Sequence, residues 1–226
     1  MIISLTGFMG CGKSSVGRKL SELLCCSFMD LDDVIVENAG KSIPEIFATD
    51  GETAFRKMER EVLRDIITSA GRHSVPEAPS HLSMGPSPYP VNTPKIDRFP
   101  GTPGVGKCQF RTYASQPLEN TTIILALGGG AVMQAECEKT VHESTVCIYL
   151  KASVDTLLRH LEGQAAGRPL LNTPVDTDFA LEKRILDLIA KRATTYERTA
   201  HHIIDTDNKT IEEIAAEICC ILNCQA

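Results

Sequence analysis

The sequence lacks the features that mark membrane proteins and nucleic-acid-binding proteins. No apolar run approaches the roughly 20 residues that a helix needs to cross a bilayer. The 226 residues carry a net charge of −6, whereas a nucleic-acid surface needs clustered Lys and Arg in excess. We therefore expect neither a membrane nor a nucleic acid as a partner, and any anionic ligand must be held by a local group of positive charges.

Cysteine pairs with metal-binding or redox spacing are also missing. The nine cysteines include two adjacent pairs, at 25–26 and 219–220, but no C-x-x-C motif, and the six histidines are dispersed. Adjacent cysteines rarely form useful cross-links, and residues 2–5 open the chain without a secretory pattern. We expect reduced thiols, no structural metal and a cytoplasmic location.

The sequence does contain short apolar runs that alternate with amphipathic helical patterns. The apolar runs predict strands at 2–6, up to 29, and at 121–127, 146–150 and 202–205. The helical patterns predict helices at 13–24, from Ser42, after Gly51, from Ser153, at 177–196 and from Thr210. In the last of these helices we expect one buried stripe, formed by Ile211, Ile214, Ile218 and Ile221. This alternation predicts one three-layer α/β domain over residues 1–226 with a central parallel sheet.

Two segments depart from this pattern. Nine of the twelve prolines lie between 76 and 117, which leaves no room there for a long helix or a central strand. We interpret residues 70–119 as a flexible, proline-rich inserted loop. The Gly-rich, polar residues 162–174 contain Arg168 and are predicted to form a mobile lid.

The strongest functional motif follows the first predicted strand. Residues 7–14 read GFMGCGKS and fit G-x-x-x-x-G-K-[ST] between a predicted strand and a predicted helix. In such a loop the backbone amides and the helix N-terminus hold phosphates, the lysine reaches the β- and γ-phosphates, and the hydroxyl ligates Mg²⁺. The residues predicted to bind ATP here are Gly10, Cys11, Gly12, Lys13, Ser14 and Ser15.

A second segment, at 101–108, matches only part of this motif. It has the glycine and lysine spacing, but Cys108 replaces the hydroxyl residue. Pro100 and Pro103 interrupt it, and no apolar strand precedes it. We predict no second phosphate site.

A P-loop alone defines only a broad class of phosphate-binding proteins, so the family must be inferred from further motifs. They are Asp30-x-Asp32, Phe55-Arg56, Gly128-Gly129-Gly130, Arg168-Pro169-Leu170-Leu171 and Arg192-x-x-x-Tyr196. Together with the P-loop, their order and spacing resemble those of shikimate kinases over the whole chain except the proline-rich segment. The resemblance implies a P-loop kinase fold with a mobile lid, and an enzyme that phosphorylates the 3-hydroxyl of shikimate with Mg·ATP, in aromatic amino acid biosynthesis. We expect a monomer.

The resemblance also implies how the acceptor is bound. Arg56 and Arg192 are similar to the family's pair of carboxylate-binding arginines, whose planar guanidinium groups bind carboxylates in a bidentate manner. Asp32 resembles the carboxylate that holds ring hydroxyls and acts as base or orienter for the attacking hydroxyl. The substrate-binding glycines are Gly128, Gly129 and Gly130, which bring backbone amides close to the substrate.

The catalytic residues implied by the resemblance are Lys13, Asp32 and Arg168. Arg168 resembles an arginine finger supplied in cis, which contacts ATP from the lid and stabilises charge on the transferring phosphoryl group. Asp30 resembles the residue that contacts Mg²⁺ through water, beside Ser14. Arg159 is the candidate for the adenine contact, although residues 205–209 lack the proline usual in the family.

The sequence leaves two alternative functions open. Gluconate is also a carboxylate, so a gluconate kinase is one alternative, and a nucleotide-binding regulator without turnover is the other.

The thiol of Cys11 lies in the P-loop beside Lys13, where a helix N-terminus and a cation favour the thiolate. We therefore predict that alkylation of Cys11 blocks ATP binding and that ATP protects against it.

Overall fold

The structure is a computed structural model that describes residues 1–72, 122–161 and 178–223. Its centre is a sheet of five parallel strands in the order β2-β3-β1-β4-β5. The strands are β1 (Ile2–Thr6), β2 (Ser27–Asp30), β3 (Ile123–Ala126), β4 (Val146–Lys151) and β5 (His202–Asp205). This sheet confirms the predicted three-layer α/β fold with a central parallel sheet.

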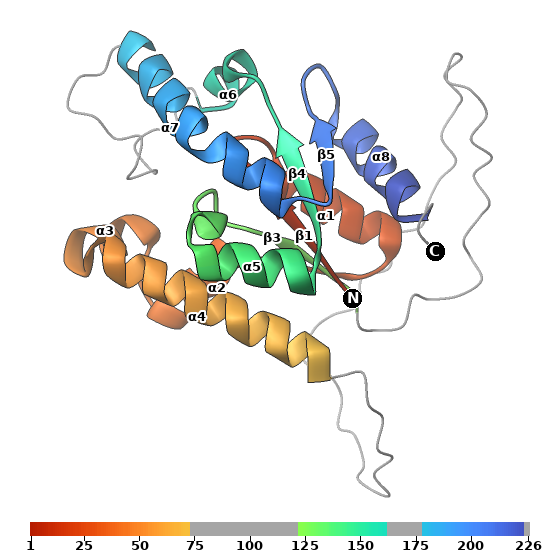
Figure 1. Cartoon of the computed structure of the whole chain (residues 1–226), viewed down its shortest axis with the longest axis horizontal. Coiled ribbons are helices and arrows are strands. Elements are labelled where there is room, and N and C mark those ends of the chain that lie inside the picture. Colours follow the sequence, from red (N-terminus) through yellow and green to blue (C-terminus); the bar gives the residue numbers. More distant parts are fainter. Residues whose placement is uncertain (73–121, 162–177, 224–226) are drawn as a thin grey trace, which may run out of the picture. The chain divides into compact units, whose positions relative to one another are not determined.

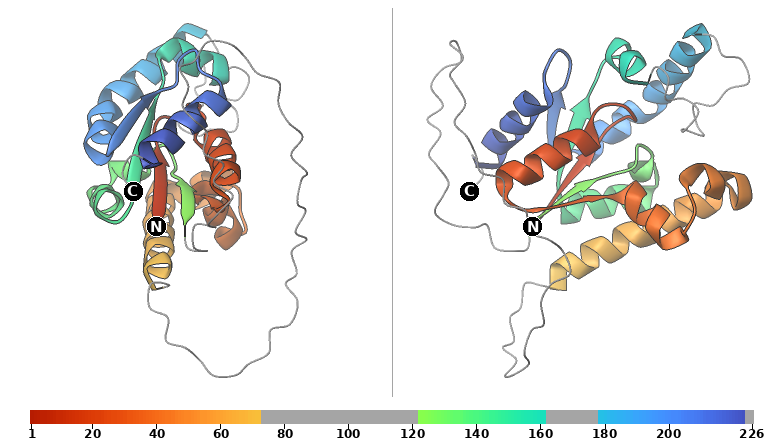
Figure 2. Two further views of the ribbon diagram at one scale, coloured as in Figure 1. Left: turned by 90° about the vertical axis from the view of Figure 1, so that its right-hand side faces the viewer. Right: turned by 180° about the vertical axis from the view of Figure 1, so that it is seen from behind.

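Helices cover both faces of the sheet (Figure 1). They are α1 (Lys13–Leu24), α2 (Leu31–Ala39), α3 (Ile43–Thr49), α4 (Gly51–Arg72), α5 (Ala135–Ser144), α6 (Val154–Leu161), α7 (Asp178–Thr199) and α8 (Ile211–Asn223), with a short 3₁₀ turn at η1 (Ala131–Met133). The view from behind in Figure 2 shows α1 and α8 together over one face. Helices α4, α5 and α7 lie on the other side of the sheet (Figure 1).

Alternation along the strands separates two apolar layers. In β1, which is buried throughout, Ile3 and Leu5 pack into the layer under α1 and α8, whereas Ile2 packs into the layer under α2, α4 and α5. Strands buried on both faces are typical of parallel sheets, because successive side chains point to opposite faces. β1 therefore lies between the two apolar layers at the centre of the sheet, and this position supports the loop that follows it.

The predicted helix starts are confirmed by their caps. Ser42 and Glu45 form a capping box at α3, Ser153 Oγ accepts from the amide of Thr156, and Thr210 and Glu213 bond reciprocally at α8. One burial prediction is wrong, because Ile211 is 40% exposed, at the start of α8. The buried stripe of α8 begins only at Ile214, and Ile211 borders a cavity instead.

Several sequence predictions lie outside the described residues. These are the lid at 162–174 with Arg168, the P-loop-like segment at 101–108, and residues 73–119 of the proposed insertion. Helix α4 runs to Arg72 and so includes the first three positions assigned to that insertion. Among the helices that the structure describes, none is long and apolar enough to cross a membrane.

Candidate active site

The site lies where three neighbouring strands end. Leu5 of β1 and Asp30 of β2 both stand beside Ala126 of β3 in the register of the sheet. Their carboxyl ends therefore bring together the P-loop (residues 7–14), the acidic start of α2 and the glycine turn at 128–130. This edge is where open α/β sheets bind ligands.

The P-loop has the geometry of a phosphate cradle. Gly7 has φ +143°, and a Cβ there would lie 2.6 Å from the Leu150 carbonyl oxygen, so no other residue fits. Helix α1 begins at Lys13, directly after the loop. The buried Lys13 Nζ donates to the carbonyl oxygens of Gly7 at 3.0 Å and of Phe8 at 2.9 Å. The ammonium group is thus held inside the loop, at the positive end of a helix.

Ser14 and Asp30 meet at the edge of the loop. Ser14 Oγ donates to Asp30 Oδ2 at 2.5 Å, and Asp30 Oδ1 accepts from the amide of Asp32 at 3.1 Å, which caps α2. A hydroxyl and a carboxylate side by side are hard oxygen ligands that fit Mg²⁺. No group of three or more His, Cys, Asp and Glu side chains that could hold a metal exists within the described ranges.

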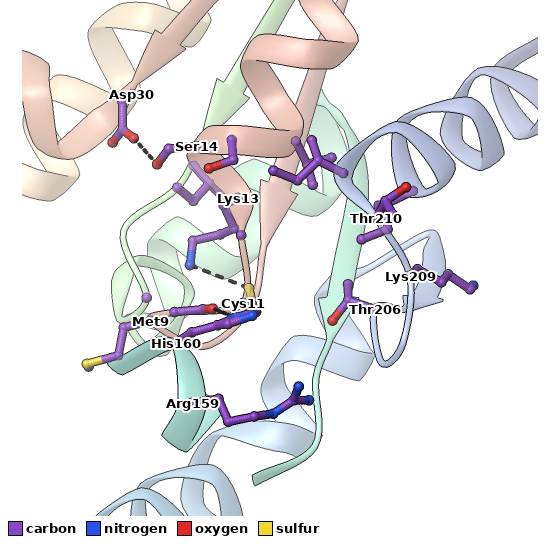
Figure 3. A pocket seen from close by; sticks show the side chains of 18 of the residues that line it. Met9, Cys11, Lys13, Ser14, Asp30, Arg159, His160, Thr206, Lys209 and Thr210 are labelled. Atoms are coloured by element: carbon purple, nitrogen blue, oxygen red, sulfur yellow. Dashed lines mark hydrogen bonds between the residues drawn. The ribbon is translucent and has the colours of Figure 1, made fainter. Parts of the chain in front are cut away.

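Lys13, Ser14 and Asp30 line one cavity (Figure 3). Asp32 lines the same cavity. The six P-loop residues predicted to bind ATP, from Gly10 to Ser15, all line it, together with Gly129 and Arg159. Burial raises the pKa of the Asp32 carboxyl, and the neighbouring Asp30 raises it further, while Lys13 and Arg56 lower it. A buried carboxylate whose pKa is raised in this way is a stronger proton acceptor than one in water.

Arg56 is held by two carboxylates of its own helix. In α4, Arg56 Nη1 donates to Glu59 Oε2 at 2.8 Å, and Nη2 donates to Glu52 Oε1 at 3.2 Å. Glu59 is fully buried, its Oε1 has no hydrogen-bond partner among the described residues, and burial raises its pKa although Arg56 opposes this. Sequence reasoning missed Glu59. The available signal was its i+3 spacing from Arg56, which places both on one face of the helix.

The glycine turn packs directly on these side chains. A Cβ at Gly128 would lie 2.7 Å from Asp32 Oδ1 and 2.8 Å from Glu59 Oε1. A Cβ at Gly130 would lie 2.6 Å from Arg56 Nη1. The absence of side chains in the turn lets the backbone approach the acidic and basic groups that the sequence placed in the acceptor site.

Arg192 reaches the same turn from α7. Its Nη1 donates to the Gly129 carbonyl at 3.2 Å, and its guanidinium lies 5.9 Å from the centroid of the Phe8 ring. Tyr196 is buried against Tyr149, and its hydroxyl also donates to the Gly129 carbonyl. Helix α7 therefore joins the turn to the P-loop.

The fold thus brings together four of the five principal residues predicted for the site: Lys13, Asp32, Arg56 and Arg192. Arg168 lies outside the described residues. Cys11 is 3% exposed, with its sulfur 3.8 Å from Lys13 Nζ, so an alkylating reagent reaches it only when the loop opens. Sequence reasoning also missed His160, whose ring contacts the loop.

A strand, a glycine-rich loop and a helix opening on Lys13, next to an acidic strand end, define the P-loop class of nucleotide-binding α/β proteins. The family model described as shikimate kinase matches residues 9–75 and 105–223. The chain therefore belongs to the shikimate kinase family, which confirms the resemblance, and it is a kinase.

Individual relatives agree with this assignment. The chain is 30% identical to the shikimate kinase of Salinibacter ruber over 229 residues, covering 100% of this chain and 86% of that protein. It is 32% identical to a shikimate kinase of Thermus thermophilus over 216 residues, covering 96% of this chain and 86% of that protein. The solved shikimate kinase from Acinetobacter baumannii in complex with shikimate superposes with a TM-score of 0.72 at 25% identity, covering 99% of this chain and 93% of that chain.

Proposed function

We propose that this enzyme transfers the γ-phosphoryl group of ATP to the 3-hydroxyl of shikimate, which gives shikimate 3-phosphate and ADP. The observation that carries the proposal is the convergence of a phosphate cradle, a buried carboxylate and two arginines at the ends of β1, β2 and β3. A kinase for a hydroxylated acid needs these three parts within reach of one another.

The acceptor half holds an acid that also carries hydroxyl groups. Arg56 and Arg192 bind the carboxylate, and Glu59 orients Arg56 by the 2.8 Å bond to its Nη1. Asp32 accepts the hydrogen bond of the attacking hydroxyl and takes its proton as the oxygen attacks phosphorus, a role that its raised pKa favours. The turn at 128–130 supplies backbone amides against the ring.

The donor half holds the phosphates. Loop amides bind the phosphate oxygens, and Lys13 exchanges its bonds to the Gly7 and Phe8 carbonyls for the β- and γ-phosphates. Ser14, with Asp30 through water, would hold Mg²⁺, which when bound neutralises phosphate charge. Arg168 stays a prediction as the arginine finger of the lid, as do a monomeric state and a cytoplasmic location.

Release of ADP from ATP, measured with shikimate and with gluconate, tests this proposal. We expect saturable turnover with shikimate and none above background with gluconate. In Arg56→Ala, saturation by shikimate should be lost, with the apparent KM raised about 100-fold or more, because a charge-assisted bidentate contact disappears.

Arg60→Ala is the matched control for Arg56→Ala. Arg60 lies one turn further along α4 and contacts Gln134 and Glu136 at the edge of the helix pair. It should keep the shikimate KM of the unaltered enzyme. Turnover with gluconate in place of shikimate would contradict the proposed substrate, and an unchanged shikimate KM in Arg56→Ala would contradict the assignment of the carboxylate site.

A further inference from the structure

A histidine outside the P-loop bonds one of the loop's carbonyl groups. His160 lies in the last turn of α6, and its Nδ1 lies 2.8 Å from the carbonyl oxygen of Gly10. Because a carbonyl oxygen only accepts, the hydrogen is on Nδ1 and the ring donates it. The exposed ring borders the central cavity close to Cys11 (Figure 3).

The end of α6 holds Gly10 from a second side as well. Gly10 has φ +84°, and a Cβ there would lie 2.9 Å from Leu161 Cγ. Leu161 is fully buried in the core layer that includes Phe8 and Cys11. The hydrogen bond from His160 is therefore anchored to the core by the next residue of its own helix.

The bond from His160 differs from those made by Lys13. The carbonyl groups of Gly7 and Phe8 are bonded by Lys13 Nζ, which the proposed function assigns to the phosphates. The ammonium group has three donors, so it must give up at least one of these bonds to reach both phosphates. The bond between His160 and Gly10 uses no group that the phosphates need, so it persists in the complex.

Holding the Gly10 carbonyl also fixes a neighbouring amide. The peptide group is planar and trans, so the N–H of Cys11 points away from the carbonyl of Gly10. In the structure this N–H points across the loop to the Phe8 carbonyl, at 3.3 Å. One hydrogen bond from α6 thus holds the peptide group between Gly10 and Cys11, whose N–H closes the loop on the Phe8 carbonyl.

We propose that His160 is a positioning residue for the nucleotide, because its Nδ1–H preorganises the P-loop through Gly10. The inference rests on the nucleotide site of the proposed function and not on the identity of the acceptor. Without the donor, the free loop samples more conformations, and binding must select one of them at an entropic cost. Nucleotide affinity should fall, whereas kcat should change little because the bound phosphates restore the loop.

Calorimetric titration of the full-length enzyme with Mg·ADP tests the inference in two variants. His160→Leu removes the donor, and ADP should bind about tenfold more weakly. His160→Asn places an amide nitrogen where Nδ1 stands, and ADP should bind within about threefold of the unaltered enzyme. In turnover, the KM for ATP should rise in His160→Leu, with kcat within about twofold and the KM for shikimate unchanged.

His142→Leu is the matched control, since His142 Nδ1 also bonds a carbonyl group, that of Thr199, at 3.1 Å, away from the P-loop. It should bind ADP as the unaltered enzyme does. The inference fails if His160→Leu binds ADP as tightly as the unaltered enzyme does. It fails equally if His160→Asn binds ADP as weakly as His160→Leu, because packing of the ring, and not its hydrogen bond, would then explain the loss of affinity. His160→Ala takes the place of the leucine variant if that one does not fold. An unaltered enzyme that bound no Mg·ADP would instead overturn the proposed function.

Discussion

The donor and acceptor halves of the site are built in different ways. The donor half is local, since residues 7–14 form the loop directly after β1 and the first residues of α1, and only Asp30 comes from another strand, β2. The acceptor half takes Asp32 from α2, Arg56 from α4, a turn after β3 and Arg192 from α7. The first half forms wherever β1 and α1 pack, whereas the second needs several packed helices. The two halves should therefore fail separately.

The largest expected effect that separates the halves comes from Asp32→Asn. Loss of the proton acceptor should lower kcat by about 100-fold to 10,000-fold. The affinity for Mg·ADP should change little, because the P-loop does not depend on this carboxylate. Turnover assays and calorimetric titration of the same preparation measure the two quantities, and a parallel loss of ADP binding would show that the halves are not independent.

A smaller effect is expected from Glu59→Gln, which keeps the shape of the side chain and removes its charge. Arg56 would lose its buried ionic partner, so the KM for shikimate should rise about tenfold, with ADP affinity unchanged. Glu52→Gln is the matched control, because Glu52 bonds the same guanidinium but its side chain is 54% exposed, against 1% for Glu59. Exposed ion pairs contribute little, so this variant should behave as the unaltered enzyme. Equal effects in the two variants would contradict the role of burial.

The smallest effect is expected at the opposite end of the sheet, in neither half of the site. His201 Nδ1 accepts from the amide of Cys147 at 3.0 Å, and its ring stacks on His142. Burial lowers the pKa of His201 below its usual 6.5, and His142 and His202 lower it further. The unfolded chain therefore binds the proton more readily, so this contribution to stability is complete above about pH 6.5 and is lost as the pH falls towards the folded-state pKa.

Thermal unfolding between pH 5 and pH 8 measures this contribution. In His201→Asn, whose amide oxygen can accept the same bond without titrating, the decline in Tm below pH 6.5 should be shallower, by no more than about 2 °C. The kinetic constants at neutral pH should not change. A steeper decline in the variant would contradict the sign of the effect.

The local features of the fold were predictable from the sequence. Short apolar runs located all five strands of the described sheet, and cap residues located the starts of α3, α6 and α8. Helices α2 and α5 were missed. The acidic residues after β2 were assigned to the site without a helix, but Asp30 accepts from the amide of Asp32 and so starts α2 there.

The candidate site was predictable where a contiguous motif or a family spacing existed. Lys13 and Ser14 followed from the P-loop pattern, and Asp32, Arg56 and Arg192 followed from the resemblance. Tertiary contacts produced the features that were missed. The bond between His160 and Gly10 joins residues that are 150 positions apart, and no periodicity in the sequence encodes it.

A crystal structure of the enzyme with Mg·ADP and shikimate tests most directly whether the two halves form one site. The account predicts that the shikimate carboxylate lies within hydrogen-bonding distance of both Arg56 and Arg192. It also predicts that the 3-hydroxyl lies against Asp32 and faces the β-phosphate across the space left by the transferred group. Shikimate bound with its carboxylate away from both arginines, or its 3-hydroxyl turned away from the P-loop, would contradict the account.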